Sequence, residues 1–235
     1  MKDRPIPVRQ VQAALLALVL ASVLCFGFVG VRTMYARQFA FQFFFWNLFL
    51  AWLPLLAALP LYALRSAGAR KPLLSAGLAV LWFLFFPNAP YIVTDLVHLY
   101  ERAPVPYWYD VIMIMAFAQT GLFLGYLSLY LVQEVVRSRF GRWPSWGLAL
   151  AMLALSSFGI YLGRFMRWNS WDALLSPIAT IADAARLANP GQNPQALAFS
   201  TTFFAFSLVC YLIVYSFTHL HAWVERAPVR EHPPV

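Results

Sequence analysis

Charge is what this sequence lacks most. Charged residues occupy 11% of its 235 positions, whereas hydrophobic residues occupy 62%. A soluble domain carries about 25% charged residues, because its surface must stay in contact with water. The scarcity of charge therefore excludes a soluble globular protein and predicts a membrane protein.

Cysteine is almost as rare. The chain has two, Cys25 and Cys210, and both fall within apolar runs. At a helical rise of about 1.5 Å per residue their depths in a membrane differ by about 9 Å, beyond the Cα separation of about 7 Å that a disulfide tolerates. We therefore predict two free thiols.

Long apolar runs are abundant, and six of them match the about 20 helical residues that cross a hydrocarbon core of about 30 Å. The six runs cover about 11–31, 39–64, 73–93, 109–132, 146–166 and 196–218. The first run is longer than the apolar core of a signal peptide, so we interpret it as a retained helix. The sequence predicts one integral membrane domain over 1–235, an all-α, polytopic bundle of about six transmembrane helices.

The net charge of +8 reflects membrane topology rather than a nucleic-acid site. Most Lys and Arg residues lie before the first run and after the second, fourth and sixth runs. The positive-inside rule then places these segments and both termini in the cytoplasm. No basic run is dense enough to predict a nucleic-acid partner.

The third run ends in an unusual stretch, FPNAPYIVTDLVHL, at 86–99. Pro87 and Pro90 lack a backbone N–H, and each disfavours helical geometry for the residue before it. We therefore predict that the third helix breaks at Pro87–Pro90, after only about 21 Å of helix. Irregular backbone at this depth is tolerated where protein or a water-filled cavity satisfies it, so we predict a wet or packed polar pocket on the extracytoplasmic side.

Helical spacing resumes after the break, over 91–102, with Thr94 as a candidate N-cap. Tyr91, Asp95 and His98 are separated by four and three residues, which places them on one helical stripe. We expect Asp95 and His98 to point into the same pocket.

Two later segments bring further polar groups to the same side of the membrane. YWYD opens the fourth run, and GRFMRWNSWD closes the fifth. Arg164, Arg167 and Trp171 lie at helical spacing, and the two arginines oppose the positive-inside trend, so acids or an anionic ligand should compensate them. Together with residues of the broken stretch, these segments predict a ligand site made of Asn88, Tyr91, Asp110, Arg164, Arg167, Asn169, Trp171 and Asp172.

The longest connection contains SPIATIADAARLA, at 176–188. Ser176 is a candidate N-cap and Pro177 suits the first helical position. The segment is too short and too charged to span, which predicts a short amphipathic helix on the outer membrane surface.

Small and polar residues inside the runs predict contacts between helices. Gly121 and Gly125 form a G-x-x-x-G pair, which favours a close helix contact. Asn47 lies about 12 Å from the end of its run. We expect its side chain to form a hydrogen bond to another helix. The alternative is that it lines a functional cavity.

The segments LFFPNAPYIVTDLVHL, YWYD and GIYLGRFMRWNSWD, in this order and spacing, resemble the bacterial membrane family catalogued as domain of unknown function 1361. The resemblance runs from about Phe43 to the last run, with no departure inside these motifs. It implies a multi-pass bacterial membrane fold, located in the inner (plasma) membrane. The family carries no established activity, so the resemblance leaves open whether the chain is an enzyme.

Two non-catalytic interpretations of the polar groups are open. In the first, the protein has a structural or assembly role, and its helix ends are locked by ion pairs. The acids are Asp95, Asp110 and Asp172, and the bases are Arg102, Arg164 and Arg167. In the second, which we prefer, the protein binds or handles a lipid or another anionic amphiphile, such as a lipid-linked substrate, with the arginines on its phosphate. Membrane lipids are then its partners.

The third interpretation is an intramembrane hydrolase or transferase. His98 would act as a base oriented by Asp95, or both residues would ligate a divalent metal together with Asp110 or Asp172. The sequence has no G-x-S-x-G or H-E-x-x-H, which argues against serine-hydrolase and zincin chemistry. Neither a particular cofactor nor an oligomeric state is indicated by the sequence.

Overall fold

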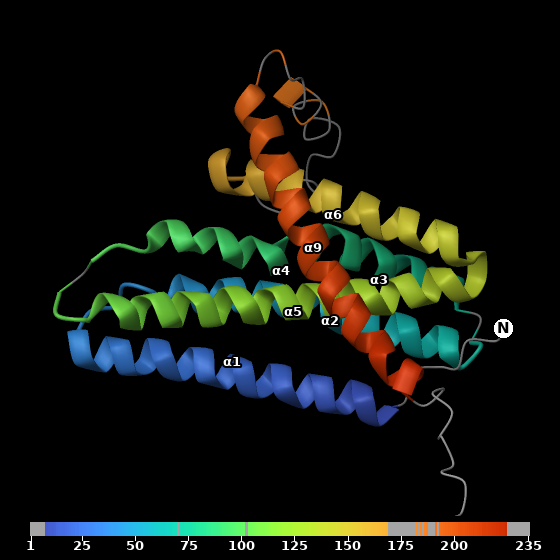
Figure 1. The fold of residues 1–235 in the computed structure, drawn as a ribbon, viewed down its shortest axis with the longest axis horizontal. Coiled ribbons are helices and arrows are strands. Elements are labelled where there is room, and N and C mark those ends of the chain that lie inside the picture. The colour runs from blue at the N-terminus through green and yellow to red at the C-terminus, as the bar shows by residue number, and fades with distance from the viewer. Residues whose placement is uncertain are drawn as a thin grey trace, which may run out of the picture.

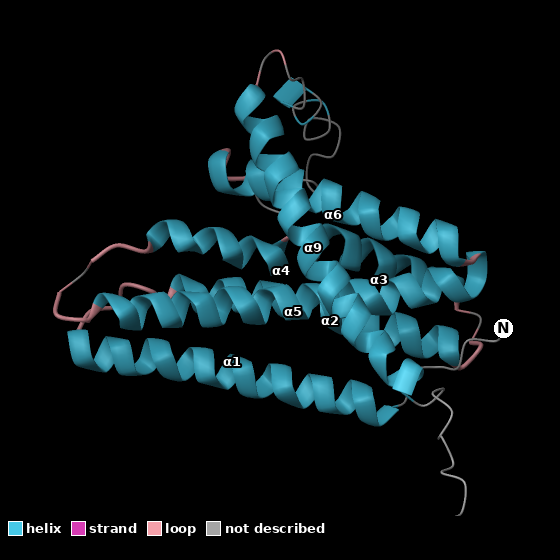
Figure 2. Ribbon diagram, viewed as in Figure 1, coloured by secondary structure: helices cyan, strands magenta, loops and turns pink. Residues whose placement is uncertain are grey.

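The computed structural model describes residues 8–69, 71–101, 103–168, 182, 184, 186, 187, 191 and 193–224. These residues form helices joined by loops, without a β-strand among them (Figure 2). In this part of the chain, six helical segments are long and apolar enough to cross a membrane. The predicted all-α, multi-pass membrane bundle is confirmed. The amphipathic helix predicted over 176–188 lies mostly outside the described residues.

The helices extend past most of the apolar runs, because residues at the ends of the runs continue the same helices. In chain order they are α1 (Val8–Ala36), α2 (Phe43–Ser66), α3 (Pro72–Phe85), α4 (Asn88–Tyr91), the 3₁₀ helix η1 (Ile92–His98), α5 (Tyr107–Phe140), α6 (Arg142–Phe165) and α9 (Pro194–Val224). The segments α3, α4 and η1 together make the third span, Pro72–His98. Cys25 and Cys210 are free thiols, as predicted.

Helix α5 is the centre of the bundle. It packs against α1, α2, α4, η1, α6 and α9 and carries buried side chains from Asp110 to Gln133 (Figure 1). Gly141 alone joins α5 to α6. Its φ of 94° and ψ of −177° are rarely adopted by residues with a side chain, so glycine suits the position. Helix α9 crosses the bundle at a steep angle and packs mainly on α6.

The alternating direction of the helices defines two ends of the bundle. Helices α1, η1 and α6 finish at one end, at the left in Figure 1, where α2 and α5 begin. We call it the η1 end. The other end, where α2 and α5 finish and α3 and α6 begin, is the opposite end.

The predicted break of the third helix is confirmed, and residues within the break supply hydrogen bonds to its backbone groups. Helix α3 ends at Phe85, and the amide of Asn88 donates to the Phe85 carbonyl at 3.1 Å. The backbone N–H of Ala89 donates to Phe86 at 3.2 Å, and that of Tyr91 to Pro87 at 3.1 Å. Phe86 and Ala89 are fully buried, so protein packing covers the break.

The segment after the break differs from the prediction. Helical geometry ends at His98 instead of continuing to 102, and residues from Ile92 onward wind as a 3₁₀ helix. Thr94 caps no helix; its hydroxyl donates back to the Tyr91 carbonyl at 2.7 Å. Prolines predict where a helix stops, but nothing local in this stretch distinguishes a 3₁₀ from an α continuation.

Glycines of two helices enclose the broken segment. A Cβ on Gly121 of α5 would lie 2.5 Å from the carbonyl oxygen of Ala89, and one on Gly125 would lie 3.1 Å from the Ala89 Cβ. On the other side, a Cβ on Gly163 of α6 would lie 3.3 Å from the Tyr91 ring. The close contact predicted from the G-x-x-x-G pair is confirmed, and its partner is the break.

Candidate functional site

A buried ion pair lies just beyond the break. The Asp95 side chain is 1% exposed, and Arg164 donates from Nη2 to its Oδ1. Asn47 donates from Nδ2 to the other oxygen, Oδ2, at 2.8 Å. Helices α2, η1 and α6 thus meet at one carboxylate, and the predicted hydrogen bond of Asn47 across helices is confirmed.

The guanidinium of Arg164 is in turn surrounded by Thr94 and by residues of the predicted stripe. Its Nε donates to the Thr94 hydroxyl at 2.9 Å, and its Cζ lies 4.7 Å from the centroid of the Tyr91 ring. Its Nη1 lies 3.4 Å from His98 Nε2. Tyr91, Asp95 and His98 therefore do converge, and the point of convergence is Arg164. We call Asn47, Tyr91, Thr94, Asp95, His98 and Arg164 the Arg164 cluster.

His98 is the exposed member of the cluster, with 39% of its side chain accessible. Its Nε2 lies 4.0 Å from Asp95 Oδ1, which is too far for a hydrogen bond. Its ring packs edge-on against Phe43, with centroids 5.0 Å apart. Both oxygens of Asp95 already accept hydrogen bonds, so Arg164 and Phe43 hold the His98 ring in place. This geometry does not favour His98 as a general base oriented by Asp95.

Metal ligation gains little support from this geometry. Within the described residues, no three His, Cys, Asp or Glu side chains lie close enough together to hold a metal ion. Asp95 and His98 are therefore without a third ligand from that part of the chain, and Asp172 lies outside it.

Asp110 belongs to a second ion pair, with Arg32 of α1. Arg32 donates from Nε to Oδ1 at 2.7 Å and from Nη2 to Oδ2 at 3.0 Å, and each side chain is 2% exposed. The Cζ of Arg32 lies 4.4 Å from the centroid of the Phe41 ring. Asp110 thus has a different partner from the arginines named in the sequence-based structural interpretation. The sequence analysis did not identify Arg32. It follows the first apolar run directly, at the end of the bundle where Asp110 begins the fourth run, and this placement could have indicated the ion pair.

Aromatic rings connect the two ion pairs. Phe41 lies against Arg32, and its ring centroid is 6.1 Å from that of Phe43. Phe43 in turn contacts His98. The two charged groups at the η1 end are therefore parts of one packed layer, although their charges are neutralised separately.

The remaining predicted site residues lie elsewhere or outside the described residues. Asn88 stabilises the break by its bond to Phe85. Arg167 is exposed and adopts a left-handed conformation, with a φ of 58°, so the helical spacing expected to relate it to Trp171 ends with α6. Asn169, Trp171 and Asp172 lie outside the described residues.

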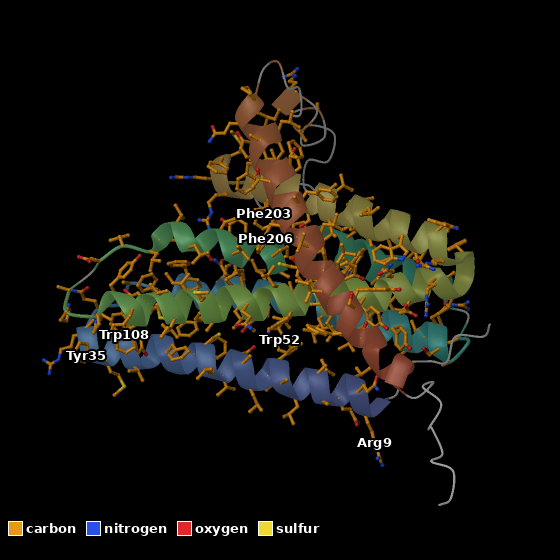
Figure 3. All side chains as sticks on the ribbon, in the orientation of Figure 1. Arg9, Tyr35, Trp52, Trp108, Phe203 and Phe206 are labelled. Carbon is orange, nitrogen blue, oxygen red and sulfur yellow. The ribbon has the colours of Figure 1, made fainter. Side chains whose placement is uncertain are left out.

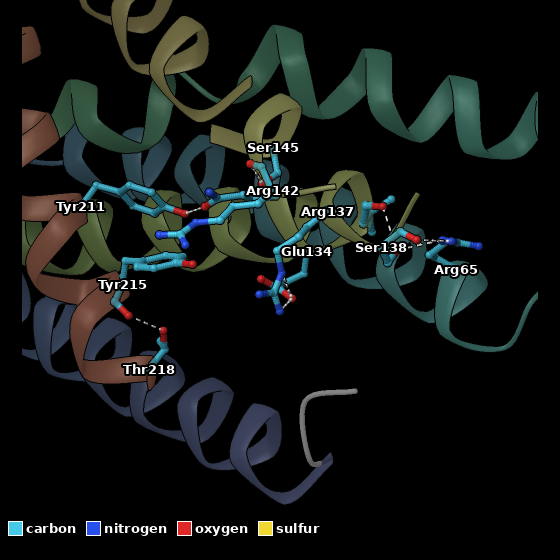
Figure 4. A network of polar contacts seen from close by, with 11 residues as sticks. Arg65, Glu134, Arg137, Ser138, Arg142, Ser145, Tyr211, Tyr215 and Thr218 are labelled. Carbon is cyan, nitrogen blue, oxygen red and sulfur yellow. Dashed lines mark hydrogen bonds and ion pairs between the residues drawn. The ribbon is translucent and has the colours of Figure 1, made fainter. Parts of the chain in front are cut away.

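A polar network at the opposite end was not predicted (Figure 4). Arg65 of α2 donates to the hydroxyl and the carbonyl of Ser138, at 2.9 and 2.8 Å. The hydroxyl of Tyr211 donates to Oε1 of Gln133, which is buried between α5 and α9. These contacts join α2 and α9 to the end of α5, and we interpret them as structural.

A protein-family model supports the sequence resemblance. The model described as "Protein of unknown function (DUF1361)" matches residues 46–212, which include the break and the whole Arg164 cluster. Searches of curated proteins and of solved structures each return no significant match. Because the family model matches well over half of the sequence, the chain belongs to the DUF1361 family.

Proposed function

We propose that this protein binds the anionic head group of a membrane amphiphile at the η1 end, on the extracytoplasmic side, and handles a lipid or lipid-linked substrate there. Arg167 supplies the charge that attracts the head group. Arg164, in the last turn of α6, and His98 form the polar wall beside it.

The observation that carries this proposal is the difference between the two arginines. The charge of Arg164 is neutralised by Asp95, and its donors are engaged by the cluster. Arg167 is exposed, and within the described residues its side chain has no hydrogen bond or ion pair. An arginine with free donors at a membrane boundary suits a phosphate group, which its planar fork binds through two hydrogen bonds.

The surroundings of Arg167 supply the apolar part of the site. Arg167 lies just beyond α6, three residues after Arg164, and its φ of 58° ends the helix there. Exposed apolar side chains of Phe165 and Met166 lie next to it and suit the acyl stem of an amphiphile.

The test compares two lipids with the same acyl chains, phosphatidylglycerol and phosphatidylcholine, titrated onto the full chain in neutral micelles and counted by native mass spectrometry. We expect a preference of about tenfold for the anionic lipid, the size of one charge-assisted contact. Arg167→Gln should abolish most of this preference, because it removes the charge while keeping a polar side chain.

The chain offers a closely matched control. Arg37 is also exposed at the η1 end and also left-handed, with a φ of 52°. Arg37→Gln removes the same charge from the same end and should leave the preference intact. An undiminished preference in Arg167→Gln, or an equal loss in Arg37→Gln, would contradict a head-group site at Arg167.

A further inference from the structure

The Arg164 cluster has a fixed charge balance. The Asp95 carboxylate accepts from Arg164 through Oδ1 and from Asn47 through Oδ2, the latter at 2.8 Å. The other guanidinium nitrogens also face partners, since Nε donates to Thr94 and Nη1 lies 3.4 Å from His98 Nε2. An arginine donates hydrogen bonds and accepts none, so this contact requires an unprotonated Nε2 and a neutral ring. The cluster therefore holds one positive and one negative charge, which cancel.

The burial of Asp95 prevents a phosphate from taking its place. Asp95 is 1% exposed, whereas Arg164 is 17% exposed. A phosphate that displaced the carboxylate would leave it buried without a partner, which is strongly unfavourable. We therefore expect Asp95 to stay on Arg164 while a head group is bound. The head group then meets the charge of Arg167 rather than the charges of both arginines.

The end of α6 disfavours a second negative charge on the ligand. The backbone N–H groups of Met166 and Trp168 both donate to one carbonyl, that of Leu162. The other carbonyls of a last helical turn carry partial negative charge. The attraction to one guanidinium grows in proportion to the charge of the ligand, whereas the cost of taking that charge out of water grows with its square. A ligand with one negative charge is thus the better match.

The depth of the site makes such charge effects large enough to measure. Tyr35, in the last turn of α1, and Trp108, in the first turn of α5, are largely exposed at the η1 end (Figure 3). Exposed Tyr and Trp side chains gather at the level of the lipid head groups, so this end lies at the boundary between hydrocarbon and water. At an effective dielectric constant of about 20, two unit charges about 12 Å apart change an affinity about tenfold, without direct contact.

We infer that Asp95 determines the charge of the lipid that this protein binds. By neutralising Arg164 it restricts the site to phosphodiester lipids, which carry one negative charge, and disfavours phosphomonoester lipids, which carry nearly two. The inference rests on the head-group site proposed at Arg167, and it names the class of lipid for that site. Asp95 acts through Arg164 and touches no ligand itself.

The test varies the charge of the phosphate and keeps the acyl chains constant. Dioleoylphosphatidylglycerol and dioleoylphosphatidic acid are titrated separately onto the full chain in neutral micelles at about pH 8, with dioleoylphosphatidylcholine as the zwitterionic reference. Bound lipid is counted by native mass spectrometry. We expect phosphatidylglycerol to bind at least as tightly as phosphatidic acid, and tighter binding of phosphatidic acid would overturn the inference. Equal binding of phosphatidylglycerol and phosphatidylcholine would instead remove the head-group site itself, and this inference with it.

Two matched variants show whether Asp95 sets this preference. Asp95→Asn uncovers the charge of Arg164 and keeps the size of the side chain. The affinity for phosphatidic acid should then rise about tenfold relative to that for phosphatidylglycerol, because its second charge gains an attraction of its own. Glu134→Gln removes the same charge beside Arg137 at the opposite end, and should leave the ratio unchanged. An unchanged ratio in Asp95→Asn, or an equal rise in Glu134→Gln, would overturn the inference, and the comparison in the unsubstituted protein needs neither variant to fold.

Discussion

The two partners of the Asp95–Arg164 pair differ in their access to water. Asp95 is 1% exposed and Arg164 is 17% exposed. Removing one partner of a buried pair costs about 3–5 kcal/mol, because the other charge stays buried and unpaired. Arg164→Gln should therefore lower the free energy of unfolding by about that amount, and Asp95→Asn by less, in a denaturation series in mixed micelles.

A second ion pair serves as the control for this prediction. Arg137 and Glu134 lie three residues apart on α5 and are 23% and 11% exposed. Arg137→Gln should cost less than about 1 kcal/mol, since a partly hydrated pair on one helix contributes little. Equal losses in Arg164→Gln and Asp95→Asn would mean that burial of the carboxylate does not control the stability of the cluster.

Residue contacts along one helix were predictable, and contacts across helices were less so. The spacing of Tyr91, Asp95 and His98 predicted a shared face, because spacing along a helix fixes direction. The partner of Asp110 is 78 positions away in the sequence. Which helices become neighbours depends on packing of the whole bundle, and no spacing within a single run contains that information.

At the scale of the elements, the contact between α5 and the break yields a second prediction. Gly121→Ala would place a Cβ 2.5 Å from the backbone oxygen of Ala89, which no side-chain rotation can relieve. We expect a loss of about 1–3 kcal/mol in the free energy of unfolding, the usual cost of overpacking. Gly125→Ala should cost less, because its nearest atom lies at 3.1 Å.

Glycines in open positions supply the comparison for that series. A Cβ on Gly27 or Gly30 of α1 would meet no atom within 4 Å. Alanine at these positions should leave stability unchanged or raise it, because alanine favours a helix by up to about 1 kcal/mol over glycine. Similar losses at Gly27 and Gly121 would show that the close contact with Ala89 is not what requires glycine.

The break itself was predictable because its cause is local. Pro87 and Pro90 act on their own backbone and that of their immediate neighbours. The sequence left open whether water or protein would fill the space around it. Protein fills it, because glycines of α5 and α6 let these helices approach the break closely. Helix α6 begins more than 50 residues after Pro90, so local sequence does not indicate this contact.

At the scale of the whole molecule, an even number of candidate spans predicts that both termini lie on the same side of the membrane. We expect a cysteine introduced at Gly68 or Arg139 to be labelled from the cytoplasm, and one at Arg37 or Glu101 from the opposite side. Membrane-impermeant maleimide, applied to intact and to opened cells, measures this directly. Basic residues concentrate at the opposite end of the bundle, which is the physical reason for the expected direction.

The native thiols set the background of that experiment. Cys25 is buried and Cys210 is half-buried between helices, so neither should react before the introduced residue. Labelling of position 37 from the cytoplasm would reverse the topology and place the η1 end inside the cell.

Apolar length and composition predicted the number of spans, because crossing a membrane requires both. The length of α5 was underestimated. Its 34 residues extend about 51 Å, well beyond a hydrocarbon core of about 30 Å. At the opposite end, α5 continues through polar residues that include Glu134 and Arg137. The predicted run was defined by apolar residues and therefore ended before them.

The burial of Asp95 has a consequence for how the protein is made. Its counter-charge, Arg164, leaves the ribosome 69 residues later, after the whole of α5. Until then the third span holds an unpaired carboxylate and an interrupted helix, which lipid alone accommodates poorly. We therefore expect a nascent chain that ends before α6 to remain beside the insertion machinery, and the third span to be released into the bilayer only when α6 arrives to neutralise it.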